Sequence, residues 1–126
     1  MKLPLLFLAG LVAMTLIGCR PPVIELGQPI TDTITASDAD DEDWKSKTYV
    51  IDVRNGVQYF LDLTTKDGNV VGVWSGDIGD YIIEVSPTTT TRSVPYIFTK
   101  GGSQEIFIQS PASQVPSTFT FKIWSP

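Results

Sequence analysis

Apolar and polar residues alternate with a period of two along most of the chain after residue 30, and this pattern restricts the fold more than any other feature. Tyr49, Ile51 and Val53 alternate with other side chains, and Val57 to Leu63 repeats the pattern. A period of two is typical of β-strands with one buried face. No stretch after residue 18 sustains the apolar i, i+3, i+4 spacing of an amphipathic helix. The chain is therefore expected to be all-β.

Turn-forming residues divide the alternating runs into short strands. Asn55-Gly56 separates the first two runs and predicts a two-residue type I′ hairpin. Later runs are separated at residues 67–68, 76–79, 86–93, 101–102 and 110–117. About seven or eight strands in such a length predict a single antiparallel β-sandwich, jelly-roll-like, over residues 30–126. Its expected core includes Tyr49, Ile51, Val53, Tyr59, Leu61, Phe119, Phe121 and Ile123.

Residues 1–18 have the composition of a cleaved signal peptide. Lys2 precedes a run of apolar or small residues that is too short for the roughly 30 Å hydrocarbon core of a bilayer. The run ends in Leu16-Ile17-Gly18-Cys19, which is similar to the bacterial lipobox. In that family the cysteine is acylated, with chains such as palmitate, and becomes the new N-terminus. Cys19 is the only cysteine, so lipidation is favoured over an ordinary signal peptide with a coincidental cysteine.

Residues 19–29 contain three prolines and predict a short, extended tether between the lipid and the domain. Lipidation implies a membrane anchor in the bacterial cell envelope. Arg20, rather than Asp, follows Cys19, and Asp in that place resembles an inner-membrane retention signal. The expected location is therefore the outer membrane in a Gram-negative host, or the outer face of the plasma membrane in a Gram-positive one.

The composition excludes several functions. The formal net charge is −5, and it becomes −6 when Lys2 is removed with residues 1–18. An acidic chain gains no counterion-release energy from phosphates, so no nucleic-acid partner is expected. The chain has no histidine, which excludes a Ser-His-Asp triad and histidine-ligated metals. We expect no enzyme, and a small carboxylate-dependent hydrolase is the third and least favoured hypothesis.

An acidic segment precedes the first long strand. Its carboxylates can supply oxygen ligands to calcium, and they are Asp38, Asp40, Asp41, Glu42 and Asp43. The segment lacks the glycine and the bidentate glutamate of an EF-hand loop, because Asp43 and Tyr49 stand in their places. A solvated loop is the favoured interpretation. No cofactor is expected, and calcium is the alternative.

Strict alternation turns a second set of large side chains away from the core. These are Phe60, Trp74, Ile97, Phe107 and Trp124. Clustered on one sheet, they would form an apolar patch suited to a protein or glycan partner. The alternative is that β-bulges turn some of them inward, or that loops cover them.

The order of the segments resembles the bacterial pre-peptidase C-terminal domain over roughly residues 27–124. The residues that carry the resemblance are Ser37–Trp44, Tyr49–Val53, Gly56–Leu63, Gln104–Ile108 and Phe119–Ile123. Such domains usually accompany secreted proteases and are themselves non-catalytic. The resemblance therefore implies a binding or accessory module with no catalytic residue to carry over.

These observations predict a non-catalytic, lipid-anchored envelope protein that binds a protein or polysaccharide near the membrane. The alternative is an inhibitor or exclusion factor that inserts a loop into an incoming enzyme or channel. The loops expected to do so are residues 86–95 and 110–117.

Overall fold

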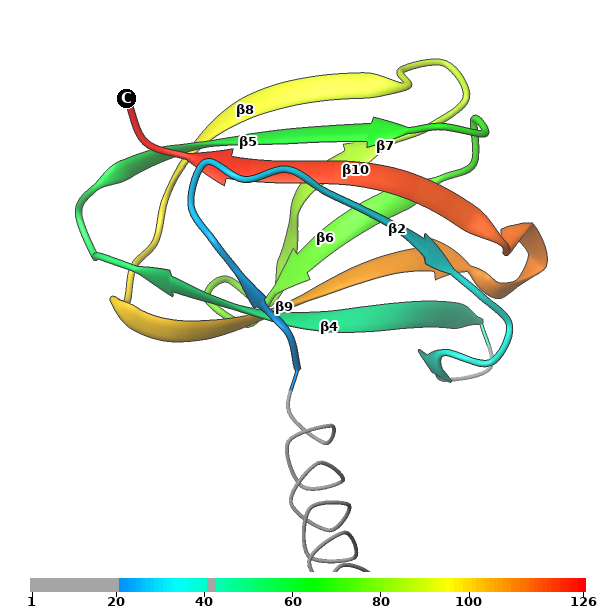
Figure 1. Ribbon diagram of the computed structural model, residues 1–126, viewed down its shortest axis with the longest axis horizontal. Coiled ribbons are helices and arrows are strands. Elements are labelled where there is room, and N and C mark those ends of the chain that lie inside the picture. Colours follow the sequence, from blue (N-terminus) through cyan, green and yellow to red (C-terminus); the bar gives the residue numbers. More distant parts are fainter. Residues whose placement is uncertain (1–20, 41–42) are drawn as a thin grey trace, which may run out of the picture.

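Ten strands in two packed sheets account for most of residues 21–40 and 43–126, which are the residues that the computed structural model describes (Figure 1). The strands are β1 (Val23–Ile24), β2 (Ile30–Ile34), β3 (Ala39–Asp40), β4 (Trp44–Val53), β5 (Gln58–Thr65), β6 (Val71–Ser75), β7 (Asp80–Val85), β8 (Thr91–Ile97), β9 (Gly102–Pro111) and β10 (Ser117–Trp124). The six-stranded sheet has the order β1-β4-β9-β6-β7, with β3 paired to β4, and the four-stranded sheet has the order β2-β10-β5-β8. All of these pairs are antiparallel except β1–β4. The predicted all-β sandwich is therefore confirmed.

The core lies between the two sheets. The side chains expected there are at most 5% exposed, and they are Tyr49, Ile51, Val53, Tyr59, Leu61, Phe119, Phe121 and Ile123. Val71, Val73, Ile106 and Ile108 of the six-stranded sheet complete the packing. The alternating pattern thus correctly predicts which side of each of these strands is buried.

The predicted Asn55-Gly56 hairpin is wrong. β4 pairs with β9, whereas β5 pairs with β10 and β8, so the turn carries the chain from one sheet to the other. A type I′ turn needs positive φ at both central residues. Gly56 has φ +79° but Asn55 does not have a positive φ. The Arg54 N–H donates to the Tyr59 hydroxyl at 2.9 Å, which holds this corner in place.

The sandwich begins within the segment expected as a tether. Val23 and Ile24 pair with Val50 and Ile51 of β4, and Ile24 is 3% exposed. The Gly27 N–H then donates to the Ile123 carbonyl at 2.8 Å. Residues 22–29 are therefore attached to both sheets, and Figure 1 shows β1 beside β4 where the described chain starts.

A tyrosine–aspartate hydrogen bond links the two sheets near each edge of the sandwich. Near one edge the Tyr49 hydroxyl of β4 donates to Asp32 of β2 at 2.7 Å. Near the other edge the Tyr96 hydroxyl of β8 donates at 2.7 Å to Asp77, in the turn between β6 and β7. Asp77 also accepts hydrogen bonds from the Thr99 hydroxyl and from the backbone N–H groups of Thr99 and Lys100. These bonds fix the separation of the sheets where the core ends.

Candidate functional site

The structure does not bring the five residues of the predicted partner-binding set together. Trp74 and Phe107 belong to β6 and β9 of the six-stranded sheet, whereas Phe60, Ile97 and Trp124 belong to β5, β8 and β10 of the four-stranded sheet. We call the outward-facing side chains of these sheets the six-stranded face and the four-stranded face. Alternation predicts the side of a strand on which a residue lies but not the sheet to which the strand belongs.

Trp74 and Phe107 form the centre of the six-stranded face. They stand directly opposite each other in the β6–β9 register, with ring centroids 5.7 Å apart and an interplanar angle of 61°. Both side chains are half-buried. In the described chain the Trp74 indole N–H has no hydrogen-bond acceptor, and it is not a buried unsatisfied group. A donor and two ring surfaces are therefore open to a partner.

Tyr81 and Trp44 extend this aromatic surface. Their ring centroids are 6.0 Å apart, and the Tyr81 hydroxyl donates to the Gln109 side chain at 2.7 Å. The Tyr81 ring packs closely against Gly72. A Cβ at that position would lie only 2.7 Å from the ring. Because Gly72 has no side chain, it leaves room for the Tyr81 ring at this point.

The sequence analysis missed both of these aromatics. Strict alternation with Ile83 and Val85 turns Tyr81 inward, but a register shift between Val73 and Trp74 places Tyr81 opposite Trp74 on the outward side. Trp44 directly follows the acidic segment, and the alternation that begins near Tyr49 does not assign it to a face. Its position four residues before Thr48, which stands opposite Phe107, was the available signal.

The six-stranded face is acidic. Glu84 and Glu105 lie at exposed outward positions of β7 and β9, and Asp52 lies at one of β4. Lys45 and Lys47 alternate to the other side of β4. Neither glutamate carboxylate takes part in a hydrogen bond or ion pair within residues 21–40 and 43–126. Their charges are thus available to a partner.

The aromatic pair of the four-stranded face is surrounded by its own partners. Phe60 and Trp124 stack with centroids 4.9 Å apart and an interplanar angle of 27°. The Trp124 indole N–H donates to Asp62 at 2.9 Å, and the Ser93 hydroxyl donates to the other oxygen of that carboxylate. Lys122 places its ammonium 5.4 Å from the Trp124 ring centroid. This pair forms part of a self-contained cluster.

Threonines cover much of the rest of the four-stranded face. Hydroxyl pairs join neighbouring strands at 2.9 to 3.3 Å, between Thr31 and Thr120, Thr33 and Thr118, and Thr64 and Thr91. Such cross-strand pairs stabilise a sheet directly. Ile97 stands opposite Gln58 near the end of β8 and is 51% exposed. Pro95, exposed on the same side of β8 and opposite Phe60, continues the apolar surface from Ile97 to the stacked pair, whose indole N–H is already bonded to Asp62.

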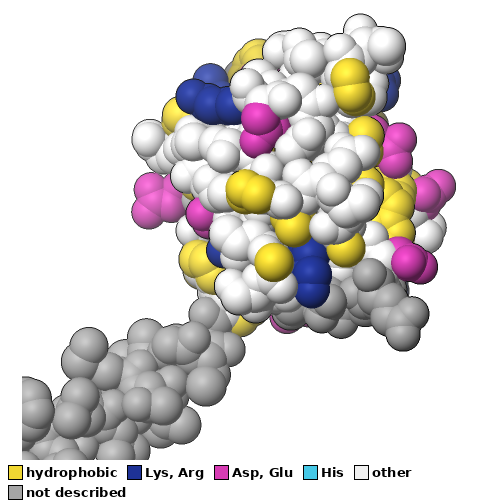
Figure 2. Space-filling view, turned by 90° about the vertical axis from the view of Figure 1, so that its right-hand side faces the viewer, with side chains coloured by type: hydrophobic (Ala, Val, Ile, Leu, Met, Phe, Trp, Pro, Cys, Tyr) yellow, Lys and Arg dark blue, Asp and Glu magenta, His cyan; other side chains and the backbone are white. Residues whose placement is uncertain are grey.

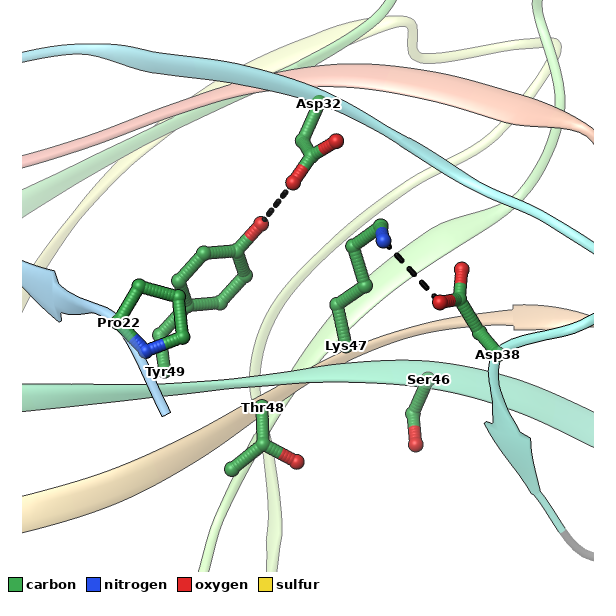
Figure 3. A pocket seen from close by; sticks show the side chains of 7 residues that line it. All are labelled: Pro22, Asp32, Asp38, Ser46, Lys47, Thr48 and Tyr49. Carbon is green, nitrogen blue, oxygen red and sulfur yellow. Dashed lines mark hydrogen bonds and ion pairs between the residues drawn. The ribbon is translucent and has the colours of Figure 1, made fainter. Parts of the chain in front are cut away.

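A cavity of about 270 Å³ opens between the sheets beside β2 and β4 (Figure 3). Figure 3 shows Asp32, Tyr49, Lys47 and Asp38 directed into the gap, while Thr48 points to the other side of β4. The Lys47 ammonium lies 3.1 Å from an Asp38 oxygen, and the other Asp38 oxygen accepts the Thr35 N–H at 2.7 Å. Pro22, Ser46 and Thr48 complete the lining, and the Ser46 side chain points to the same side of β4 as that of Thr48.

The ionisable groups in this cavity are held in hydrogen bonds and an ion pair that stabilise the fold. Burial raises the pKa of Tyr49, and the hydrogen bond and charge of Asp32 raise it further, so the phenol stays protonated. Partial burial raises the pKa of Asp38, but the Thr35 N–H and Lys47 outweigh it and hold that pKa below its usual value. Tyr49 keeps its proton and the Asp38 carboxylate is already paired. The cavity therefore holds two interstrand links and no free acid or base.

The acidic segment is described only in part. Asp41 and Glu42 lie outside the described residues, as does the side chain of Asp40. Asp38 is paired with Lys47, and Asp43 is exposed. Within the described part of the chain, no group of three or more His, Cys, Asp or Glu side chains is placed to hold a metal ion. Calcium binding by this segment stays a prediction.

Two other predictions concern the N-terminus. The signal peptide and the lipidation site Cys19 both lie outside the described residues. Residues 21–40 and 43–126 contain no helix with the length and apolarity needed to cross a membrane.

The end of the sandwich on the right-hand side of Figure 1 faces the viewer in Figure 2. Figure 2 shows hydrophobic side chains scattered among polar ones at this end, with a larger hydrophobic group only along one margin, bordered by carboxylates. A continuous apolar surface is therefore not seen in this view.

Comparison with known proteins identifies the fold. No family model matches the chain, and no curated protein matches its sequence. The pre-peptidase C-terminal domain of a collagenase from Bacillus anthracis is similar with a TM-score of 0.54 at 10% identity, over 82% of this chain and 94% of that one. CorA, a surface-associated copper-binding protein important in copper acquisition by Methylomicrobium album BG8, is similar with a TM-score of 0.52 at 9% identity, over 85% of this chain and 98% of that one. The resemblance to a pre-peptidase C-terminal domain is thus supported at the level of the fold.

Proposed function

We propose that this protein is a lipid-anchored, non-catalytic binding module of the bacterial cell envelope, and that it binds a protein or polysaccharide through the six-stranded face. The observation that carries the proposal is the difference between Trp74 and Trp124. The Trp74 N–H has no acceptor in the described chain and lies on a face with unpaired carboxylates, whereas the Trp124 N–H is bonded to Asp62. An aromatic centre with free polar groups has the composition of an interface core.

The anchor rests on the sequence Leu16-Ile17-Gly18-Cys19. Three residues lie between Cys19 and Val23, where the first strand begins, and the four residue-to-residue steps span about 13 Å when fully extended. An acylated Cys19 would therefore hold the sandwich close to the bilayer. CorA, described as surface-associated, offers a precedent for this fold at a cell surface.

The binding module is also proposed to have no catalytic activity. Carboxylate-dependent hydrolysis needs two acids that flank a cleft with different pKa values. The two carboxylates of the described cavity, Asp32 and Asp38, are bonded to Tyr49 and Lys47 instead. Copper is not proposed as a ligand, since the chain has no histidine and softer metals favour imidazole and sulfur ligands.

The loop-insertion hypothesis has less support. In the 110–117 loop, Gln114 accepts a hydrogen bond from Asn69 at 2.7 Å and another from the Val70 N–H. In the 86–95 segment, β8 already begins at Thr91, which leaves a short turn closed by backbone bonds between Ser86 and Thr89. Both segments are thus held against the sandwich.

Site-specific photo-crosslinking in the producing cells tests the binding face. A benzophenone side chain is placed at Thr48, opposite Phe107, and for comparison at Thr120 on the four-stranded face. We expect a covalent adduct from position 48 and none from position 120. Crosslinks from Thr120 alone would place the partner on the other face. Two further probe positions, Thr88 and Ser113, lie in the 86–95 and 110–117 segments. Crosslinks from these positions alone would support the inhibitor hypothesis.

Cell fractionation tests the anchor. We expect the wild-type protein in the membrane fraction and the Cys19→Ser variant, which has no thiol to acylate, outside it. A Cys19→Ser variant that still fractionates with membranes and migrates unchanged on a gel would show that the lipobox interpretation is wrong.

The acidic segment is proposed to be a solvated loop. A ligand that binds only the folded state raises stability by RT ln(1 + [L]/Kd). We therefore expect added calcium to leave the thermal midpoint unchanged. A clear rise at millimolar calcium would establish a site in this segment.

A further inference from the structure

We propose that the six-stranded face recognises a cationic polypeptide segment, with an arginine or lysine side chain lying on the Trp74–Phe107 pair and paired with Glu84 or Glu105. The inference rests on the proposed function, which makes this face the binding face, and it adds the chemical class of the partner.

Charge complementarity supports a cationic partner. Glu84, Glu105 and Asp52 are the carboxylates at the outward positions of β7, β9 and β4. No lysine or arginine stands at an outward position of β4, β6, β7 or β9. Arg92 of β8 comes near Glu84, but its guanidinium contacts the backbone carbonyl, at 3.5 Å, and not the carboxylate. The charge of this face is therefore uncompensated by its own residues.

The register places a carboxylate on each side of the aromatic row. Phe107, Trp74 and Tyr81 lie side by side across β9, β6 and β7. Glu105 lies two residues before Phe107 on β9, and Glu84 stands opposite Gly72, two residues before Trp74. Both glutamates are therefore diagonal neighbours of Trp74 on the adjacent strands, at a separation of about 7 to 8 Å. A cation within about 6 Å of the Trp74 ring, the range of a cation–π contact, is thus also within reach of a glutamate.

Other occupants fit these features less well. Anionic lipid headgroups attract basic surfaces and would be repelled by the three carboxylates. A neutral saccharide can stack on the aromatic rings but leaves the charges without a role. A second copy of this acidic chain would bring like charges together, which is costly at an interface. A basic segment uses both the rings and the carboxylates.

Binding of defined peptides to the full-length chain in non-ionic detergent tests the inference. The probe is an arginine–serine octapeptide, and the control is the same peptide with uncharged citrulline in place of arginine. Tryptophan fluorescence gives the dissociation constants. At about 50 mM salt we expect the arginine peptide to bind about tenfold more tightly than the control, and the difference to shrink at about 300 mM as screening increases.

Variants locate the effect. Glu84→Gln and Glu105→Gln should each weaken arginine-peptide binding several-fold, and together by about tenfold. Glu25→Gln also removes one exposed carboxylate, but in the segment between β1 and β2, and should leave binding unchanged. Trp74→Leu should weaken binding as well, because it removes the aromatic surface while keeping an apolar side chain.

The outcomes separate this inference from the proposed function. Equal binding of the two peptides, no binding of the arginine peptide, or unchanged binding by the double glutamine variant would overturn the cationic partner. If crosslinks from Thr48 persist in that case, the face stays the binding face and a neutral saccharide becomes the partner to test. If Thr48 gives no crosslinks, the face itself is wrong.

Discussion

The two outward faces of the sandwich carry similar aromatic pairs in different surroundings. On the four-stranded face, Trp124 stacks on Phe60, donates its N–H to Asp62 and lies under Lys122. On the six-stranded face, Trp74 meets Phe107 edge-on, and its N–H has no acceptor in the described chain. The first pair is complete within the fold, and the second leaves polar groups for a partner.

Outward aromatic residues alone therefore do not identify a binding face. Aromatic cross-strand pairs stabilise sheets whether or not anything binds to them. What distinguishes the faces is whether the donors and charges beside the rings are already satisfied. Matched substitutions on the two faces test that distinction.

The largest effect on stability is expected at Trp124. Trp124→Ala removes the stacked ring and leaves Asp62 without the indole donor, so the free energy of unfolding should fall by about 3 kcal/mol. Trp74→Ala removes only an edge contact and should cost about 1 to 2 kcal/mol. Urea unfolding followed by circular dichroism measures both. Equal losses would remove the distinction between a structural face and a binding face.

Gly72 gives the next largest effect and tests the shape of the six-stranded face. Gly72→Ala places a methyl group 2.7 Å from the Tyr81 ring, so the ring must move and the protein should lose about 2 kcal/mol. Gly76→Ala is the matched control, since its nearest atom, on Trp74, would lie at an ordinary 3.9 Å. Tyr81 NMR shifts should change in the first variant alone. Unchanged Tyr81 shifts in Gly72→Ala would contradict the close contact.

The sequence predicted the core better than the connections. Alternation correctly identified the buried sides of β4, β5 and β10, because burial of one face is a local property of each strand. The Asn55-Gly56 turn was misassigned, because a turn residue permits a sharp change of direction without specifying which strands then pair. Pairing of β4 with β9, about 50 to 70 residues away along the chain, is decided by the packing of the whole sandwich.

The candidate site was only partly predictable for the same reason. Trp74 and Phe107 were identified as outward-facing, but their neighbours in space come from β7 and from the start of β4. Tyr81 depends on a register shift, and no single residue type marks such a shift in a sequence. The state of the indole N–H groups depends on cross-strand partners such as Asp62, which only the assembled sheet defines.

Asp77 and Glu84 contrast a carboxylate that holds the fold with one that is open to a partner. Partial burial raises the pKa of Asp77, but hydrogen bonds from Thr99, Tyr96 and Lys100 outweigh it, and its pKa lies below the usual 3.8. Such a group contributes stability above its unfolded-state pKa, and this contribution is lost as the pH falls through the folded-state pKa. Asp77→Asn should cost about 1 kcal/mol at pH 7 and flatten the acid decline below about pH 4.

Glu84→Gln is the matched control for Asp77→Asn. Its carboxylate makes no hydrogen bond in the described chain, so neither the stability at pH 7 nor its acid dependence should change measurably. Thermal melts between pH 7 and pH 3 give both comparisons. An acid dependence that Glu84→Gln alters and Asp77→Asn leaves intact would reverse the roles assigned to the two carboxylates.

The smallest effect is expected at Lys122, whose ammonium lies 5.4 Å from the Trp124 ring centroid. Lys122→Met keeps the length of the stem and removes the charge, so the loss should be close to an exposed cation–π contact, about 0.5 kcal/mol. Lys66→Met, at an exposed position just after β5, should cost nothing measurable. A double-mutant cycle with Trp124→Leu measures the coupling energy of the pair, because Lys122→Met should no longer lose the cation–π contact where the ring is already absent. A coupling energy of zero would mean that Lys122 does not complete the aromatic cluster, and that its charge, unlike the Trp124 N–H, is left for a partner.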